Sequence, residues 1–162
     1  KQTAALVGRR VGIGDIEKGK YFFEGRQFDC IVCLNVLEHI KDDKKALKNM
    51  FNLLKDGGFL ILLVPVFDFL YGEIDKSIGH FRRYEKNELQ KMVKSLRFEI
   101  IKSRIINFLG AIGWWISSKV LSNNKIDESK IKLFNFIAPL VLRLEDLFEP
   151  PVGTSILIIM KK

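Results

Sequence analysis

The chain has 162 residues, of which 48% are hydrophobic and 28% charged, and its formal net charge is +8. This length and composition predict one globular domain with a hydrophobic core of its own. The lysines and arginines are scattered along the chain, and no RNA- or DNA-binding signature accompanies them, so nucleic acid is not an expected partner.

Membrane and export signals are also missing from the sequence. No stretch reaches the ~18 to 20 apolar residues of a membrane span. No signal peptide opens the chain, which predicts a cytoplasmic location by default.

The first part of the chain predicts a short strand from Arg10 to Gly14 that ends at Asp15 and Ile16. Gly12 and Gly14 form a G-x-G, but no third glycine follows at the required spacing. This segment is therefore not expected to be a phosphate-binding loop.

The most informative stretch is Phe28 to His39, with the sequence FDCIVCLNVLEH. Its apolar run stops at Asn35, and the polar pair Glu38 and His39 follows. The pattern predicts a fully buried central strand. In open α/β sheets ligands bind beyond the carboxyl ends of the strands, so these polar residues are expected at a site.

Two cysteines, Cys30 and Cys33, lie within this strand. Residues three apart on a strand point to opposite faces, so we interpret both as buried core thiols of a reducing compartment rather than a redox pair. The chain has no further cysteine and only two histidines, and no metal site is predicted.

The following elements alternate between helix and strand. Asp42 or Asp43 is expected to cap a helix that runs to Gly57 and Gly58, and a strand from Phe59 to Val64 ends at Pro65. A second amphipathic helix is predicted from Glu85 to Leu96. Two further strands are expected from Phe98 to Ile106 and from Ser155 to Met160.

A polar loop, Val66 to Tyr84, follows the strand that ends at Pro65. In one interpretation His80 takes a proton from an acceptor hydroxyl, Asp75 orients it, and Arg83 holds an anionic substrate group. In the other, Arg83 pairs with Asp75 or Glu73 and braces the loop.

Residues 108–153 are interpreted as a helical insertion before the last strand. Its first half is apolar nearly all round and contains Trp114 and Trp115, and its second half is expected to kink at Pro139. It could cover the sheet as a lid, form a homodimer contact, line a hydrophobic substrate groove or lie on a membrane surface.

Several motifs occur together in a familiar order. The segments from Phe28 to Asp29, from Asn35 to His39 and from Leu54 to Gly58, with a strand that ends at Pro65, resemble the middle of a class I S-adenosylmethionine-dependent methyltransferase. The resemblance implies an α/β, Rossmann-like sheet with one antiparallel strand near its end. The loop sequence GHFRRY is similar to a pattern in a bacterial subgroup associated with glycan or cell-envelope genes.

The resemblance also implies roles for individual residues. Asp15 would accept a hydrogen bond from the adenine amino group while the Ile16 backbone N–H meets a ring nitrogen, although Asp15 could equally be a turn residue. Glu38 and His39 could face the cofactor or the acceptor, or only cap the next element. Together with the polar loop and the insertion, the candidate residues are His80, Asp75 and His39 for catalysis, Asp15, Ile16, Asn35, Val36, Leu37 and Glu38 for S-adenosylmethionine, and Tyr71, Arg83, Tyr84 and Trp114 for the substrate.

Two motifs of that family have no counterpart in the sequence: the glycine-rich loop after the first strand and the acidic residue after the second. Residues 1–162 are therefore interpreted as a single domain that is incomplete at its N-terminal side, and this chain alone is expected to bind the cofactor poorly. The expected activity is methyl transfer to an unknown small-molecule, glycan or lipid-linked acceptor. The alternative is a non-catalytic module whose apolar insertion binds a partner or a membrane surface.

Overall fold

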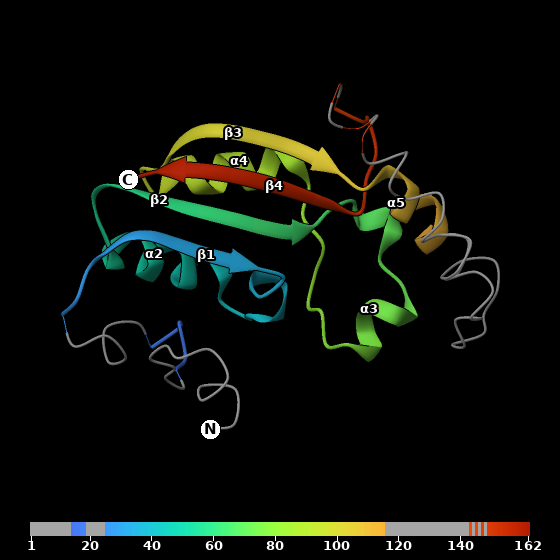
Figure 1. The fold of residues 1–162 in the computed structure, drawn as a ribbon. Coiled ribbons are helices and arrows are strands. Elements are labelled where there is room, and N and C mark those ends of the chain that lie inside the picture. The colour runs from blue at the N-terminus through green and yellow to red at the C-terminus, as the bar shows by residue number, and fades with distance from the viewer. Residues whose placement is uncertain (1–13, 19–24, 116–142, 144, 146, 148) are drawn as a thin grey trace, which may run out of the picture.

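The computed structural model describes residues 14–18, 25–115, 143, 145, 147 and 149–162. Within them one four-stranded sheet is flanked by helices (Figure 1). The strands are β1 (Phe28–Leu34), β2 (Leu54–Pro65), β3 (Glu99–Ile106) and β4 (Ser155–Lys161). The helices are η2 (Leu37–His39), α2 (Asp43–Leu53), η3 (Asp68–Leu70), α3 (Glu73–Ser77), α4 (Lys86–Ser95) and α5 (Phe108–Trp115).

The strand order in the sheet is β1-β2-β4-β3. β1 and β2 are parallel, whereas β4 runs antiparallel to both of its neighbours, β2 and β3. The last strand of the chain is therefore the reversed one. This arrangement confirms the expected α/β sheet with one antiparallel strand.

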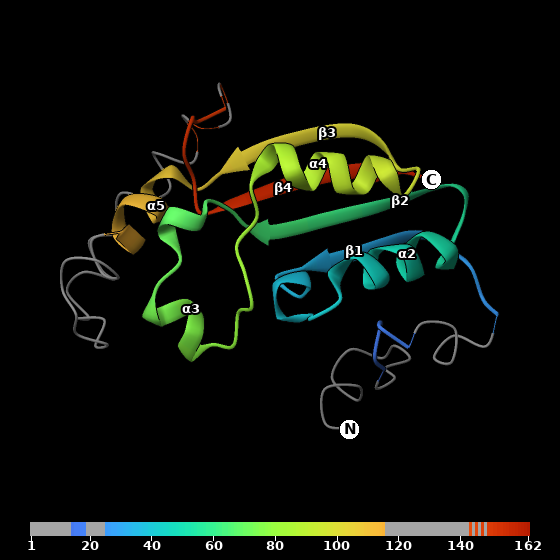
Figure 2. The same ribbon diagram turned by 180° about the vertical axis from the view of Figure 1, so that it is seen from behind.

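Two helices cover the same face of this sheet (Figure 2). Asp42 caps α2, and its Oδ1 accepts a hydrogen bond from the Lys45 N–H at 3.0 Å, as expected from an N-cap aspartate. The apolar stripes of α2 and α4 meet alternate residues of the strands. The core between them contains Leu47, Met50, Leu60, Leu62, Leu89, Val93, Ile156 and Ile158.

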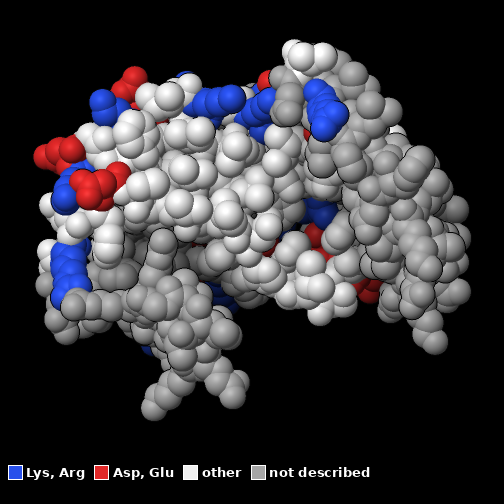
Figure 3. All heavy atoms as spheres, in the orientation of Figure 1, with Lys and Arg blue, Asp and Glu red and all other residues white. Residues whose placement is uncertain are grey.

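The predicted burial of β1 is wrong in the described part of the chain. β1 forms an edge of the sheet, and its side chains Val32 and Leu34 are 59% and 49% exposed. The reason is that α2 and α4 both lie on the opposite face. Seen from the uncovered side, the middle of the sheet shows uncharged side chains, with charged ones gathered around its margins (Figure 3).

The two cysteines illustrate the same asymmetry. Cys33 points towards the helices and is buried, whereas Cys30 is exposed on the other side, so the interpretation of both as buried thiols is wrong for Cys30. The prediction that they point to opposite faces is confirmed.

The helix α2 ends at Leu53, four residues before the expected glycine stop. Leu54 is already extended and opens β2. Gly57 has a φ of +78°, and a Cβ on Gly58 would lie 3.1 Å from the carbonyl oxygens of Phe28 and Asp29. The two glycines therefore allow β2 to start close against β1 instead of ending the helix.

Of the proposed helical insertion, the structure describes the start, as α5, and parts of the end, residues 143, 145, 147 and 149–153. Pro139 and most of the expected second helix fall outside the described residues, so the dimer, lid and membrane interpretations stay predictions. No helix in the described ranges is long and apolar enough to cross a membrane.

Candidate active site

Polar residues collect where β1 and β2 end. β1 stops at Leu34, and Asn35 then takes a φ of 51°, a left-handed conformation that asparagine tolerates better than most residues. Its N–H donates to the Leu63 carbonyl at 2.9 Å. The chain turns at once into η2, where Leu37 is fully buried and fixes the position of Glu38 and His39.

The polar loop after β2 is closed at its base. Val66 and Tyr84 form a parallel bridge, the Phe67 N–H donates to the Tyr84 carbonyl at 3.0 Å, and the Tyr84 N–H donates to the Pro65 carbonyl at 2.9 Å. Phe67 has a φ of 65°, which is rare for a bulky side chain. This closure returns the loop to the strand end, beside η2.

A second backbone contact joins the loop to η2. The Phe81 N–H donates to the carbonyl oxygen of Glu38 at 2.9 Å. This hydrogen bond brings His80 beside Glu38 and His39, which lie about forty positions earlier in the chain.

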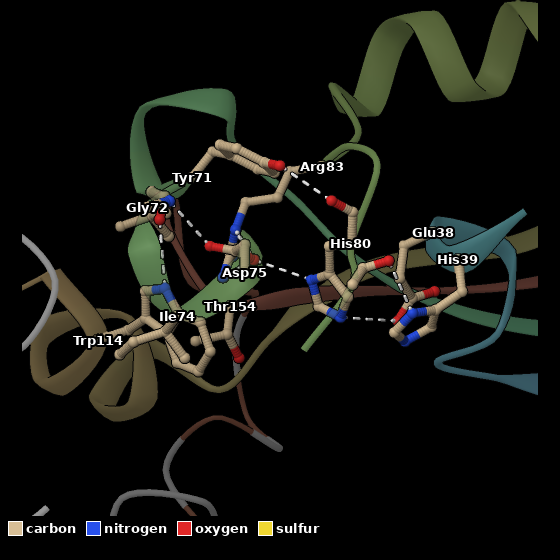
Figure 4. A network of polar contacts seen from close by, with 12 residues as sticks. Glu38, His39, Tyr71, Gly72, Ile74, Asp75, His80, Arg83, Trp114 and Thr154 are labelled. Carbon is tan, nitrogen blue, oxygen red and sulfur yellow. Dashed lines mark hydrogen bonds and ion pairs between the residues drawn. The ribbon is translucent and has the colours of Figure 1, made fainter. Parts of the chain in front are cut away.

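Asp75 is the centre of the loop and is fully buried (Figure 4). Its Oδ2 accepts the Gly72 N–H at 3.0 Å, and its Oδ1 lies 2.9 Å from His80 Nδ1. The guanidinium of Arg83 donates to the same Oδ1 through Nε at 3.0 Å, with Nη2 also at 3.0 Å. One carboxylate thus holds both the histidine and the arginine.

The remaining contacts of Arg83 are also internal. Its Nη1 donates to the Val66 carbonyl at 3.2 Å, and its guanidinium carbon lies 4.9 Å from the ring centre of Trp114. The arrangement matches the interpretation in which Arg83 braces the loop. A role in binding an anionic substrate group stays a prediction.

The other proposed substrate residues fall into two groups. Tyr71 and Trp114 are half-buried: the Tyr71 hydroxyl donates to the His80 carbonyl at 2.9 Å, and Trp114 Nε1 donates to the Leu70 carbonyl at 3.2 Å. Tyr84 is buried, and its hydroxyl donates to Asp43 Oδ2 at 3.0 Å. Burial, and then the charge of Asp43, raise the pKa of Tyr84 far above its usual range, so its hydroxyl stays protonated.

Glu38 meets His80 at the inner end of the loop. Glu38 is fully buried, and in the described part of the chain neither of its carboxylate oxygens has a hydrogen-bond partner. Its Oε1 lies 3.7 Å from His80 Nε2. Burial raises the pKa of Glu38 above its usual value, because the ionised form loses its hydration there.

His39 completes this cluster from the exposed side. Its Nδ1 lies 3.0 Å from the Gly79 carbonyl oxygen, and its ring meets the His80 ring edge to face with centres 4.7 Å apart. No side-chain pattern predicts the contact with Gly79, because the acceptor is a backbone carbonyl oxygen.

These hydrogen bonds fix the chemistry that His80 can perform. The carboxylate of Asp75 is an acceptor, so the proton of a neutral imidazole lies on Nδ1 and the lone pair on Nε2. An imidazole in this tautomer can accept a proton from a nearby hydroxyl or amine. The structure thus brings the three proposed catalytic residues, His80, Asp75 and His39, into one cluster.

The proposed adenine-binding pair lies apart from this cluster. Asp15 Oδ1 accepts the Glu17 N–H at 3.0 Å, which is the contact of a turn aspartate, and the Ile16 carbonyl accepts from Asn49 Nδ2 at 2.7 Å. Ile16 and Val36 line a cavity of about 340 Å³ along β1. Both were expected near the cofactor, whereas the side chains Ile31, Met50 and Leu53, which also line the cavity, were not.

The parallel strands β1 and β2, the antiparallel β4 and the polar cluster at the strand ends form a Rossmann-like α/β domain with a candidate active site. A family model described as a methyltransferase domain matches residues 8–111, which is more than half of the chain. The chain therefore belongs to this family of methyltransferase domains. No curated protein sequence matches it significantly.

Solved structures share the fold at low sequence identity. The YcgJ protein of Bacillus subtilis is 18% identical, with a TM-score of 0.58 over 99% of this chain and 75% of its own. An S-adenosylmethionine-dependent methyltransferase of Archaeoglobus fulgidus is 18% identical, with a TM-score of 0.55 over 94% of this chain and 66% of its own.

A third structure contains a ligand. The N-methyltransferase NodS of Bradyrhizobium japonicum, solved in complex with S-adenosylhomocysteine, is 14% identical, with a TM-score of 0.54. The alignment covers 99% of this chain and 60% of NodS, so the present chain spans well under two thirds of that enzyme.

Proposed function

We propose that this domain transfers a methyl group from S-adenosylmethionine to a hydroxyl or amine of a small-molecule, glycan or lipid-linked acceptor. The observation that carries the proposal is the His80 imidazole, whose Nδ1 lies 2.9 Å from Asp75 Oδ1 while Nε2 lies 3.7 Å from Glu38 Oε1 (Figure 4). Membership of the methyltransferase domain family supports the reaction type.

The cofactor fits the apolar side of the site. The cavity lined by Ile16 and Val36 would take the adenine. Asp15 precedes Ile16 in the chain, and Asn35, Leu37 and Glu38 adjoin Val36, so these neighbours would contact the other parts of the cofactor. An apolar cavity with a few polar groups at its rim is the usual character of such a site. S-adenosylhomocysteine in NodS, which shares the fold, supports this choice.

The remaining work of the site is to position the acceptor and remove its proton. The donor sulfonium already activates the methyl group, so the acceptor atom must lie in line with it at roughly 3 to 3.5 Å. His80 would then accept the proton from the acceptor. His39, on the exposed side of the cluster, would border the acceptor, together with Tyr71 and Trp114.

The identity of the acceptor rests on the loop sequence alone. The resemblance of GHFRRY to a subgroup associated with glycan and cell-envelope genes supports a sugar or a lipid-linked sugar. A homodimer or a membrane-surface contact through residues 108–153 is part of the same proposal, because apolar side chains dominate the described start of this segment.

The test is calorimetric titration of S-adenosylhomocysteine into this chain and into a form extended upstream by a glycine-rich strand-loop segment. We expect micromolar binding in the extended form and little or none in the present chain. The variant Val36→Arg, at a cavity residue that is 45% exposed, should abolish this binding. Ile101→Arg is the matched control, because Ile101 is 52% exposed on β3 and away from the cavity.

The opposite result would contradict the proposal. If neither form binds the ligand, or if Val36→Arg binds as well as the parent protein, the cavity is not the cofactor site. The non-catalytic alternative would then be favoured, and residues 108–153 would be the next segment to examine for a partner.

A further inference from the structure

We propose that Glu38, His39 and His80 bind a divalent transition-metal ion. One ligand atom from each of these residues lies within 4.8 Å of the others. No metal site was expected from the sequence, because the chain has only two histidines and two cysteines. The fold places both histidines beside the same buried carboxylate.

In both imidazole rings Nδ1 already has a hydrogen-bond partner, which leaves Nε2 for a metal ion. His80 Nδ1 lies 2.9 Å from Asp75 Oδ1, and His39 Nδ1 lies 3.0 Å from the Gly79 carbonyl oxygen. Each acceptor keeps the ring proton on Nδ1, so both Nε2 atoms carry a lone pair. A carboxylate or carbonyl behind the distal nitrogen is the usual way in which proteins orient a metal-binding histidine.

The carboxylate of Glu38 provides the independent observation. It is fully buried, neither oxygen has a hydrogen-bond partner in the described part of the chain, and Oε1 faces His80 Nε2 at 3.7 Å. A buried carboxylate without a partner is costly, and a bound cation would offset that cost. The Phe81 N–H holds the Glu38 backbone at 2.9 Å, so the side chain is fixed towards the histidines.

The geometry needs little adjustment. Ligand atoms around a tetrahedral ion with bonds of ~2.0 to 2.1 Å lie roughly 3.3 Å apart. The Glu38 and His80 atoms are already close to this spacing at 3.7 Å. His39 is exposed, so its side of the cluster gives solvent ions a route in.

The two arginines near the cluster, Arg82 and Arg83, should repel a bound cation only weakly, because each is paired with a carboxylate. Arg83 is the basic residue of this loop closest to the cluster, but its guanidinium is paired with Asp75 at 3.0 Å. Arg82 is paired with Asp43 at 2.9 Å. The local charge of the loop is therefore balanced before an ion binds.

The ligand set indicates the class of metal. Two imidazoles and one carboxylate suit zinc, iron, cobalt, nickel or manganese, whereas magnesium and calcium prefer oxygen ligands alone. Three protein ligands leave coordination positions for water or an oxygen of a substrate. Such an ion lowers the pKa of a bound hydroxyl, which would supply the deprotonation step when His80 Nε2 is occupied as a ligand.

The experiment starts from the 162-residue chain, stripped with chelator and dialysed. Co²⁺ and Zn²⁺ are titrated in separately, with calorimetry for stoichiometry and the visible absorption of Co²⁺ for nitrogen coordination. We expect one ion per chain and a metal-dependent rise in the melting temperature. The variants Glu38→Gln and His39→Asn should each lower the affinity at least ~10-fold.

Glu88→Gln is the matched control, because Glu88 is an exposed glutamate on α4. It should bind the metal as the parent chain does. His39→Asn keeps the proposal testable if Glu38→Gln fails to fold, since His39 is exposed. Absence of stoichiometric binding in the parent chain, or unchanged affinity in His39→Asn, would overturn the proposal without affecting the titration of S-adenosylhomocysteine.

Discussion

His80 Nδ1 lies 2.9 Å from Oδ1 of Asp75, an oxygen that also accepts a hydrogen bond from Arg83 Nε at 3.0 Å. Asp75 therefore has two tasks at once: it holds the loop from Val66 to Tyr84 together and it orients the imidazole. Substitutions in this network should separate effects on folding from effects on chemistry.

The first prediction concerns the stability of the loop. Asp75→Asn should lower the free energy of unfolding by ~3 to 5 kcal/mol, because it leaves the buried guanidinium of Arg83 without a counter-charge. Urea denaturation followed by tryptophan fluorescence measures this change. The control Glu73→Gln removes an exposed pair with Lys76 and should change stability by less than ~1 kcal/mol. Equal losses in the free energy of unfolding for the two variants would contradict a larger contribution of the buried Asp75–Arg83 pair.

The second prediction concerns proton transfer by His80. In a form of the protein that binds cofactor, His80→Ala should leave the affinity for S-adenosylhomocysteine nearly unchanged, because the ring lies apart from the Ile16 and Val36 cavity. Methyl transfer should fall by a factor of ~10² to 10⁴, the usual contribution of a general base. Release of S-adenosylhomocysteine with an acceptor found by screening measures turnover. A large loss of cofactor binding instead would place His80 in the cofactor site or the scaffold.

Local patterns in the sequence predicted the helices and strands well because short-range chemistry decides them. Asp42 caps α2 as expected, and the apolar stripe of α4 faces the core at Leu89 and Val93. The predicted burial of β1 was wrong because an apolar sequence shows that a strand can be buried on both faces, but not whether other elements cover both faces. Among the described elements, helices cover only one face of β1. Val32 points to the face that α2 and α4 leave open.

The site itself depends on contacts that no local pattern contains. Glu38 and His80 are 42 positions apart, and they meet because Val66 and Tyr84 close the loop and the Phe81 N–H binds the Glu38 carbonyl. The sequence identified the polar residues of both segments. It could not predict the Nε2 to Oε1 separation of 3.7 Å, and with it the cluster of two histidines and a carboxylate.

The third prediction follows from the raised pKa of Glu38. Its usual value is 4.5, and burial raises it in the folded state. The folded protein then binds the proton more tightly than the unfolded chain, so the free energy of unfolding should fall as pH rises from 4.5 through the raised pKa. Glu38→Gln, measured in chelator by denaturation at a series of pH values, should reduce this slope. An unchanged slope would mean that Glu38 ionises in the folded state without penalty.

The fourth prediction concerns Gly153, which lies two residues before β4 and packs against the end of β3. A Cβ on Gly153 would collide with the carbonyl oxygen of Ile106, which is backbone and cannot move aside. Gly153→Ala should therefore destabilise the protein by ~1 to 3 kcal/mol, measured by chemical denaturation. Gly113→Ala is the control, because nothing lies within 4 Å of its Cβ on α5. Alanine there should be neutral or stabilising by ~0.5 to 1 kcal/mol, and a loss at Gly113 equal to that at Gly153 would contradict the steric argument.

The last prediction separates the two cysteines by their reactivity. Cys33 is buried, and burial, with a further contribution from the charge of Glu38, raises its pKa from 9.0 to about 11. At neutral pH this shift leaves about 100-fold less thiolate, and the side chain is also out of reach of the reagent. Iodoacetamide should therefore label Cys30 on the exposed face of β1 first, as peptide mass spectrometry would show. In urea both cysteines should react at similar rates, whereas equal rates in the folded protein would mean that β1 opens readily from α2.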